Sequence, residues 1–313
     1  MKRLLTAVLA TATAALCPAH AQTVEEFSAI APGGHVMAGE VVLPEGVAGP
    51  LPGVLLISGS GRQSRDFAAF DSRYRPHHDW TQAFNAAGIA VIRFDERNTG
   101  GSGGDHRTAS LQDLVNDART VLRAASSSPG IDRARLFVLG HSEGAAIAMM
   151  LNGQGETLAG LLLAGAPARS GRQILRDQAR IEAPMTAQMG ESEREAAIEA
   201  YYREQVAYDE TRPSLRDFLD LDVPAIAGAV TAPVFVIEGG EDWQITPPQG
   251  SELAALLRAG GNAAVVHRHY DGVNHLLVHA PGEPDYARLS DFRLDPRLVE
   301  DAVAWTAQRA DLD

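Results

Sequence analysis

Short apolar runs and helical patterns alternate along most of the chain. The apolar runs are bounded by glycine and proline, and several are apolar at nearly every position, which is typical of parallel strands covered by helices on both faces. The predicted strands are residues 36–43, 53–58, 89–94, 135–139, 158–164, 233–238 and 264–270. The predicted helices are residues 79–87, 110–127, 144–151, 251–259 and 296–309. This alternation predicts an α/β fold with a mostly parallel central sheet flanked by helices.

One connection is much longer than a simple crossover requires. Residues 168–230 are helical in pattern and rich in charge, and Ser170 with Gln173 has the spacing of a capping box. We therefore predict a helical cap inserted into a single domain of residues 22–313. Tyr201 and Tyr202 keep helical spacing in this segment. They fit either a packed helix face, which we favour, or the wall of a substrate pocket.

The N-terminus has the pattern of a secretory signal. Lys2 and Arg3 precede an apolar run from Leu4 to Leu16, and a small-x-small site ends at Ala21. A run of this length is too short to span a bilayer comfortably, although an uncleaved anchor is the alternative. We expect residues 1–21 to be a cleaved signal peptide, which makes the mature protein periplasmic or secreted, without stable membrane association.

Charge and cysteine content restrict the possible partners and chemistries. The formal net charge is −13 and becomes more negative after loss of residues 1–21, which argues against nucleic acid or an anionic membrane as a partner. The only cysteine, Cys17, lies within the predicted signal. The mature protein is therefore expected to have no disulfide and no thiol nucleophile.

The most informative motif is Gly140-His141-Ser142-Glu143-Gly144. It follows the apolar strand 135–139 and precedes an alanine-rich helix, which is the layout of a nucleophile elbow. A second match, Gly100 to Gly104, has polar residues on both sides, so we interpret its central Ser102 as a loop residue. Ser142 is the predicted nucleophile.

A serine hydroxyl needs a base to accept its proton and an acid to orient that base, and in this fold both follow the serine in the sequence. Asp242 lies in the loop after strand 233–238 and is the preferred acid, with Glu238 as the alternative. His275 lies in the loop after strand 264–270 and is the preferred base, with His279 in reserve. His267 and His269 share one face of that strand and are interpreted as structural, and His141 as a residue that shapes the site.

A tetrahedral oxyanion requires two preorganised donors. The backbone N–H of Glu143, at the start of the helix, is predicted to supply one. The glycine-rich turn Ser58-Gly59-Ser60-Gly61 follows strand 53–58 and is predicted to supply the other, from Ser60 or from its glycine neighbours. A phosphate-binding loop is the competing interpretation, but the lysine and hydroxyl residue that end a P-loop are missing.

These segments resemble the α/β-hydrolase superfamily, and the chain is similar to exported bacterial hydrolases of the serine aminopeptidase and dienelactone hydrolase groups. The resemblance rests on residues 51–61, residues 88–97, the elbow, and the loops of Asp242 and His275. It covers about residues 35–310. Two departures are visible: Asn98 follows Arg97 where relatives often have glycine, and Ser58 replaces the usual histidine of the oxyanion loop.

The resemblance and the three residues imply acyl transfer to water through an acyl-enzyme, and we expect carboxylic ester hydrolysis of a small molecule. Peptidase, amidase or thioesterase activity would use the same residues, and a non-catalytic binding protein on this scaffold is the remaining alternative. No cofactor or metal is expected. His77-His78 with Asp79 suggests a metal site, but adjacent side chains diverge, so a helix start is the better interpretation.

Overall fold

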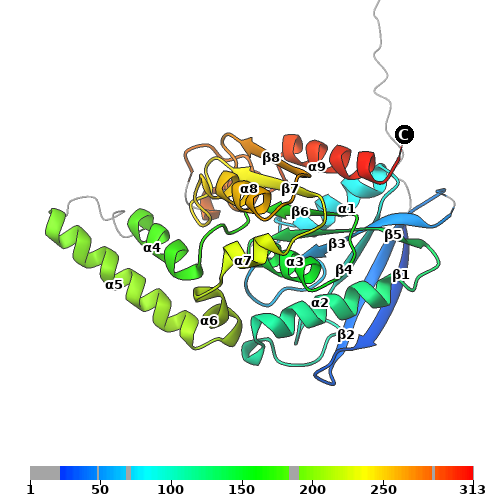
Figure 1. Cartoon of the computed structure of the whole chain (residues 1–313), viewed down its shortest axis with the longest axis horizontal. Coiled ribbons are helices and arrows are strands. Elements are labelled where there is room, and N and C mark those ends of the chain that lie inside the picture. Colours follow the sequence, from blue (N-terminus) through cyan, green and yellow to red (C-terminus); the bar gives the residue numbers. More distant parts are fainter. Residues whose placement is uncertain (1–21, 48, 68–71, 183–189, 284–285, 313) are drawn as a thin grey trace, which may run out of the picture.

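The computed structural model describes residues 22–47, 49–67, 72–182, 190–283 and 286–312. Their centre is one eight-stranded sheet with the strand order β1-β2-β4-β3-β5-β6-β7-β8 (Figure 1). The pairs β1·β2 and β2·β4 are antiparallel, and every later pair is parallel. The predicted α/β fold is confirmed. The predicted signal peptide, residues 1–21, lies outside the described residues.

The strands alternate with helices after the first antiparallel pair. The strands are β1 (Gln22–Ile30), β2 (Val36–Pro44), β3 (Leu51–Ile57), β4 (Ala90–Phe94), β5 (Ile131–His141), β6 (Gly160–Ala164), β7 (Val234–Gly239) and β8 (Val265–Tyr270). The helices are α1 (Pro76–Ala86), α2 (Leu111–Ala125), α3 (Glu143–Gly153), α4 (Gly171–Glu182), α5 (Glu191–Glu210), α6 (Pro213–Leu219), α7 (Val223–Gly228), α8 (Gln249–Ala259) and α9 (Pro296–Arg309). The described residues also form two short 3-10 turns, η1 (His106–Thr108) and η3 (Tyr286–Arg288).

The seven predicted strands and five predicted helices are all present, with ends that shift by a few residues. The additional strand β1 was not predicted. It is an edge strand that pairs with β2 from Gln22↔Pro44 to Ile30↔Val36, and it leaves Val24 and Ile30 exposed. A half-exposed strand with adjacent glutamates has no continuous apolar run, so it is defined by its pairing and not by its own pattern.

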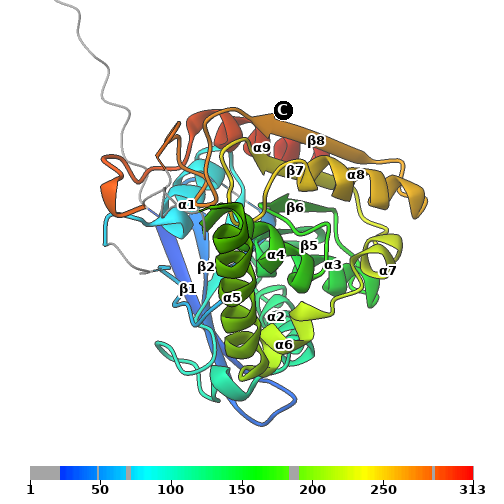
Figure 2. The same ribbon diagram turned by 90° about the vertical axis from the view of Figure 1, so that its left-hand side faces the viewer.

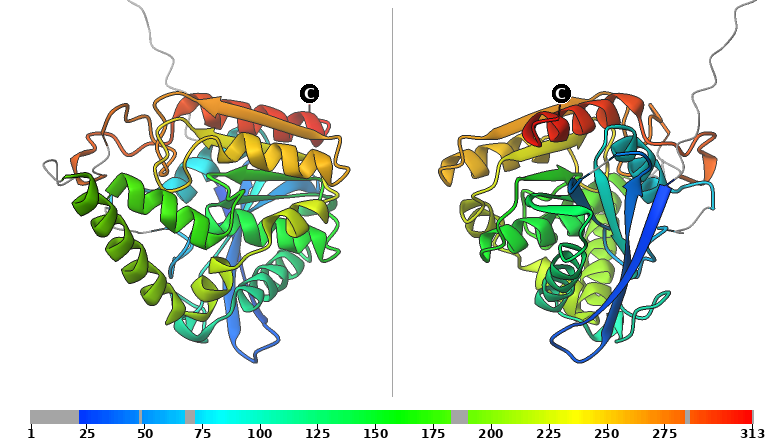
Figure 3. Two further views of the ribbon diagram at one scale, coloured as in Figure 1. Left: turned by 60° about the vertical axis from the view of Figure 1, so that its left-hand side comes forward. Right: turned by 90° about the vertical axis from the view of Figure 1, so that its right-hand side faces the viewer.

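The sheet separates two hydrophobic cores. Figure 3 shows helices on both faces of the sheet, with the β1–β2 ribbon at its edge. One core packs α2, α3, α7 and α8 against side chains such as Leu55 and Val138, while the other packs α1 and α9 against side chains such as Leu56 and Phe137. Because successive strand residues point to opposite faces, strands buried on both faces are apolar at every position.

The four helices α4 to α7 lie between β6 and β7, within the predicted cap segment 168–230, and we call residues 171–228 the helical insertion. Figure 2 shows α5 standing in front of the sheet, outside α4. The capping box is confirmed, because Gln173 Oε1 accepts the Ser170 N–H at 3.1 Å and Ser170 Oγ accepts the Gln173 N–H at 3.5 Å. Tyr201 hydrogen-bonds to Glu182, and the Tyr202 ring lies 3.7 Å from the Arg176 guanidinium. Both tyrosines therefore pack against α4, as we favoured.

Candidate active site

Ser142 occupies a strained turn between β5 and α3. Its φ is 55° and its ψ is −122°, a conformation that non-glycine residues rarely adopt. Its N–H donates to the Ala164 carbonyl at 2.9 Å, which ties the turn to the end of β6. The strand-turn-helix context of a nucleophile elbow is therefore present at Ser142.

The two glycines of the motif are required by close backbone contacts. A Cβ on Gly140 would lie 2.2 Å from the carbonyl oxygen of Gly144. A Cβ on Gly144 would lie 2.4 Å from the carbonyl oxygen of Ser58, at the end of β3. Only glycine allows the strand, the helix and the neighbouring turn to approach this closely.

The second match to the motif is built differently. Ser102 is buried in a loop, where its Oγ accepts the Ala38 N–H at 2.9 Å and donates to the Asp95 carbonyl at 2.6 Å. Both hydrogen-bonding roles of the hydroxyl are thus used to join this loop to β2 and to the end of β4. The prediction that Ser102 is a loop residue is confirmed.

Asp242 and His275 form a buried pair. His275 Nδ1 lies 2.8 Å from Asp242 Oδ2, and the two residues are 4% and 3% exposed. The other carboxylate oxygen, Oδ1, accepts the N–H groups of Gln244 at 2.9 Å and Ile245 at 2.8 Å. Since an ionised carboxylate only accepts, the His275 proton is assigned to Nδ1, and Nε2 of the neutral ring keeps its lone pair.

Gly165 and His141 bring this pair to the elbow. Gly165 follows β6 with a φ of 52°, and a Cβ there would lie 3.2 Å from His275 Cε1 and 3.3 Å from Asp242 Oδ2. The residue before it, Ala164, accepts the Ser142 N–H. The His141 ring, next to Ser142 in the chain, has its centroid 4.7 Å from that of His275. The three predicted residues therefore gather at the carboxyl ends of neighbouring parallel strands, the usual position of active sites in such sheets.

His141 holds the His275 loop in place. Its Nε2 lies 2.8 Å from the His275 carbonyl oxygen, and because a carbonyl only accepts, that nitrogen carries the proton. Burial, reinforced by the neighbouring His275, lowers the pKa of His141 to about 3, so its ring stays neutral. This contact agrees with the interpretation of His141 as a residue that shapes the site.

The alternative acid, Glu238, and the reserve base, His279, lie elsewhere. Glu238 Oε2 contacts His267 Nε2 at 3.0 Å and His269 Nδ1 at 3.1 Å. Burial opposes ionisation of Glu238, but these hydrogen bonds outweigh it and lower the pKa to about 2. His279 is exposed and contacts Asp295 at 3.4 Å. Neither Glu238 nor His279 contacts the Asp242–His275 pair in the part of the chain that the structure describes.

The glycine-rich turn after β3 lies against the elbow. A Cβ on Gly59 would lie 3.0 Å from Ser142 Cβ. Ser58 Oγ lies 3.3 Å from His77 Nε2, and His77 Nδ1 lies 3.1 Å from the Arg65 carbonyl, so the Ser58 hydroxyl donates to an unprotonated Nε2. Burial lowers the pKa of His77 to about 4, which keeps this acceptor neutral. The turn is thereby fixed beside the N-terminus of α3.

His77 and Asp79 lie in the first turns of α1, in agreement with the interpretation of this segment as a helix start. Among the described residues, no group of three or more histidine, cysteine, aspartate or glutamate side chains could hold a metal ion.

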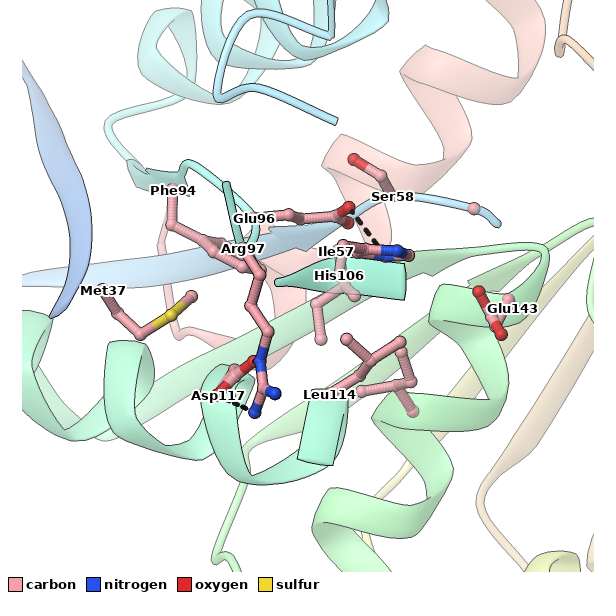
Figure 4. Close-up of a pocket in the computed structure, with 12 residues that line it drawn as sticks. Met37, Ile57, Ser58, Phe94, Glu96, Arg97, His106, Leu114, Asp117 and Glu143 are labelled. Atoms are coloured by element: carbon pink, nitrogen blue, oxygen red, sulfur yellow. Dashed lines mark hydrogen bonds and ion pairs between the residues drawn. The ribbon is translucent and has the colours of Figure 1, made fainter. Parts of the chain in front are cut away.

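A small cavity with apolar and charged lining residues lies against the turn of Ser58 and Gly59. Its volume of about 20 Å³ suffices for one water molecule. Figure 4 shows Glu143 on one side of this cavity and the ion pair of Arg97 with Asp117 on the other. Glu143 is 3% exposed, and burial raises the pKa of its carboxyl group to about 7.

Several residues of the site could not be found from the sequence. Gly165 faces the His275 ring, and His77 holds Ser58, yet both contacts join segments far apart in the chain. The only available signal was the position of Gly165 directly after a strand, where a glycine suggests a sharp turn.

Comparison with known proteins identifies the family. A family model described as serine aminopeptidase, S33, matches residues 71–282 of this chain. Esterase EstD of Thermotoga maritima is 25% identical over 276 residues, a match that covers 86% of this chain and 65% of that protein. A monoacylglycerol lipase of Mycolicibacterium smegmatis is 28% identical over 225 residues, with 66% of this chain and 78% of that protein covered.

Solved structures share the fold. An esterase of Pyrococcus furiosus has a TM-score of 0.62 at 16% identity, covering 92% of this chain and 91% of its own. An esterase of the archaeon Pyrobaculum calidifontis has a TM-score of 0.58 at 18% identity, covering 92% and 84%. At these identities the likeness extends to the fold alone, whereas the family model matches more than half of the chain. The chain therefore belongs to the serine aminopeptidase S33 family of α/β-hydrolases.

Proposed function

We propose that the protein is a serine hydrolase that cleaves carboxylic esters of small molecules through an acyl-enzyme on Ser142. The observation that carries this proposal is the buried His275–Asp242 pair, 2.8 Å from nitrogen to oxygen, gathered with a serine held in a strained turn. A serine, a histidine and an acid in this arrangement constitute the machinery of acyl transfer.

In the acylation half-reaction, the Ser142 hydroxyl oxygen attacks the ester carbonyl carbon while its proton passes to His275 Nε2. The carbonyl oxygen becomes an oxyanion, which accepts hydrogen bonds from the N–H groups of Glu143 and of the Ser60 turn. The tetrahedral intermediate then expels the alcohol oxygen, which takes the proton from His275. Asp242 stabilises the imidazolium in between and remains ionised throughout.

In the deacylation half-reaction, water repeats these steps on the acyl-enzyme. His275 removes a proton from water as its oxygen attacks the acyl carbon, the same two N–H groups hold the oxyanion, and the Ser142 oxygen leaves with the proton from His275. The products are a carboxylic acid and the regenerated enzyme. The cycle needs no oxidant, reductant or further co-reactant.

Ester cleavage is favoured over peptide cleavage for two reasons. The two curated relatives carry the names esterase and monoacylglycerol lipase. An alcohol is also a better leaving group than an amine, which must be protonated as it departs. Peptidase, amidase and thioesterase activities would use the same residues. Comparing esters with anilides and thioesters as substrates distinguishes these activities from ester hydrolysis.

The helical insertion is proposed to cover the substrate. Gln178 on α4 donates to the Gln244 carbonyl at 2.9 Å, and Gln244 lies two residues beyond Asp242. This contact supports placement of the insertion beside the proposed site. The amino acids that line its inner surface would then select the acyl or alcohol part of the ester.

The test is turnover of p-nitrophenyl esters of short and long acyl chains beside aminoacyl anilides and acyl thioesters. We expect the esters to be cleaved fastest, and Ser142→Ala to abolish their cleavage while circular dichroism and thermal unfolding stay those of the wild type. Faster cleavage of the anilides would establish the peptidase alternative. Ester turnover that survives in Ser142→Ala would contradict the proposal.

We also propose that the protein is exported. The signal-like pattern of residues 1–21 supports this, and cleavage after Ala21 would retain all of β1 as the structure describes it, from Gln22 onward. No helix in the described part of the chain is long and apolar enough to cross a membrane. Fractionation of cells that express the full chain should give a periplasmic or secreted protein whose N-terminal residue is Gln22; retention of Met1 in the cytosol would contradict the proposal.

A further inference from the structure

The loop that carries Asp242 is attached to the rest of the domain on both sides of that residue. Before Asp242 the loop is tied to the sheet, because the Gly240 N–H donates to the carbonyl of Tyr270, the last residue of β8, at 2.9 Å. After Asp242 it is tied to the helical insertion, because the Gln244 carbonyl oxygen accepts the side-chain amide of Gln178 on α4 at 2.9 Å. The position of the Asp242 carboxylate therefore depends on the insertion as well as on the sheet.

A single peptide group joins Gln178 to Asp242. The carbonyl oxygen that Gln178 binds belongs to Gln244, and the nitrogen of the same peptide bond belongs to Ile245. The Ile245 N–H donates to Asp242 Oδ1 at 2.8 Å. Because a peptide group is planar, fixing the direction of its carbonyl also fixes the direction of its N–H. The Gln178 amide therefore orients a hydrogen-bond donor of the carboxylate.

The same carboxylate orients the histidine of the site. Asp242 Oδ2 lies 2.8 Å from His275 Nδ1, and both residues are buried. Oδ1 accepts a second N–H, that of Gln244, at 2.9 Å. A continuous series of hydrogen bonds thus runs from α4 to the imidazole ring, and each bond in such a series polarises and strengthens the next.

The helix that carries Gln178 is fixed to the core of the domain. Arg169, just before α4, donates to the carboxylate of Glu252 on α8 through Nε at 2.9 Å and through Nη2 at 2.7 Å. The same guanidinium donates to Asp177, the neighbour of Gln178, at 2.5 Å. The next residue of α4, Ala179, is fully buried. Gln178 is therefore held at a defined position relative to the sheet.

We propose that Gln178 is a positioning residue, which holds the Asp242 carboxylate in the orientation that His275 requires. It acts through the peptide group between Gln244 and Ile245 and does not contact the substrate. This inference rests on the proposed function, since it concerns the acid of the same three residues. The helical insertion thus contributes to the chemical step as well as to the cover over the substrate.

The kinetics distinguish this role from that of a residue in the wall of a substrate pocket. A positioning residue affects how well the histidine accepts and returns a proton, so its loss lowers kcat and leaves KM nearly unchanged. The loss should also be the same for short and long acyl chains. A residue that contacts the substrate would instead alter KM, by a factor that changes with the length of the acyl chain.

The experiment compares the wild type with Gln178→Met and Gln178→Lys, measuring kcat and KM on short and long p-nitrophenyl esters together with thermal unfolding. Methionine has the length of glutamine but cannot donate, whereas the lysine ammonium group can donate to the same carbonyl. We expect Gln178→Met to lower kcat by about fivefold on both esters, as for the loss of one ordinary hydrogen bond. Gln178→Lys should recover most of this loss. Gln205→Met, the same change on α5, is the matched control and should keep the wild-type kcat.

A second measurement examines the pair without substrate. A proton held between an imidazole nitrogen and a carboxylate resonates far downfield in proton NMR, so the proton between His275 and Asp242 can be observed directly. We expect Gln178→Met to shift or broaden this resonance and Gln205→Met to leave it unchanged. Ser142→Ala should retain it. Ester cleavage that survives in Ser142→Ala would show that the proposed function is wrong, and the resonance would still decide the role of Gln178.

Four results would overturn the inference. They are a wild-type kcat in Gln178→Met, a loss that lies in KM or changes with acyl chain length, equal losses of kcat in Gln178→Met and Gln178→Lys, and an unchanged downfield resonance in Gln178→Met. If Ser142→Ala is inactive while any of these results is found, only the positioning role fails.

Discussion

The chain contains the same five-residue pattern twice, with opposite structural outcomes. At Gly140–Gly144 the pattern joins a buried strand to a helix, and the serine takes a φ of 55°. At Gly100–Gly104 it lies in a loop, and the Ser102 hydroxyl hydrogen-bonds to the Ala38 N–H and the Asp95 carbonyl. The difference teaches that the pattern has no chemistry of its own. Its flanking elements decide whether the hydroxyl is presented for reaction or used as a structural clamp.

The largest predicted effect concerns Asp242 and His275, the predicted partners of Ser142, which have no counterpart at Ser102. Asp242→Asn should lower kcat for ester cleavage by about 10³-fold or more, because the His275 tautomer and the forming imidazolium lose their carboxylate. Glu238→Gln is the matched control. Glu238 lies four residues before Asp242 in the chain, but its carboxylate contacts His267 and His269. We expect its kcat to stay at the wild-type level. Equal losses in both variants would show that the two acids cannot be distinguished.

The next effect concerns the glycines of the two patterns. Gly140→Ala should destabilise the fold by more than about 4 kcal/mol or prevent folding, because its Cβ would lie 2.2 Å from the Gly144 carbonyl oxygen. In the loop copy, a Cβ on Gly103 would meet no atom closer than 3.6 Å. Chemical denaturation should therefore find Gly103→Ala close to the wild type in stability. Tolerance of Gly140→Ala would mean that the tight turn at Ser142 is not present.

A third effect is the pH dependence of stability that Glu143 gives to the elbow. Its pKa is raised from 4.5 to about 7 in the folded protein, so the folded state holds the proton more tightly than the unfolded state. The resulting stabilisation is fully present below pH 4.5 and is lost as the pH rises through 7, by about 3 kcal/mol in total.

Urea unfolding between pH 4.5 and 8 measures this contribution. Glu143→Gln has no titrating group, so its stability relative to the wild type should increase across that range. Parallel pH profiles of the two proteins would contradict the raised pKa of Glu143.

The smallest effect concerns stability, for which we expect the Ser102 hydroxyl to matter more than the Ser142 hydroxyl. Ser102→Ala should destabilise the protein by about 2 kcal/mol, because a buried N–H of Ala38 and the Asp95 carbonyl lose their partner. Ser142→Ala keeps the same Cβ and should change the free energy of unfolding by less than about 0.5 kcal/mol. Chemical denaturation of both variants tests this contrast, and equal stabilities would show that the Ser102 hydroxyl is not a clamp.

Much of the fold could be predicted because its strands are unusually clear. Strands such as β3 and β6 are buried on both faces, so each is a continuous apolar run bounded by turn residues. The edge strand β1 has no such signal and depends on its pairing with β2. Local patterns predict strands that contain a clear apolar run and miss β1, in which intermediate and exposed residues alternate.

The site residues were predicted from their order along the chain, because loops after parallel strands converge at one edge of the sheet. The supporting contacts could not be found in this way. The hydrogen bond from His141 to the His275 carbonyl spans 134 positions, and no local pattern shows that the Glu143 side chain is buried. These contacts depend on how distant segments pack, and no local pattern encodes that packing.

The most direct test is to map the site of covalent labelling by a fluorophosphonate, which reacts with an activated serine. After digestion, mass spectrometry should find the adduct on the peptide that contains Ser142 and none on the peptide that contains Ser102. Asp242→Asn should label far more slowly than the wild type. An adduct on Ser102, or no adduct on Ser142 in folded protein, would contradict the account that Ser142 is the nucleophile.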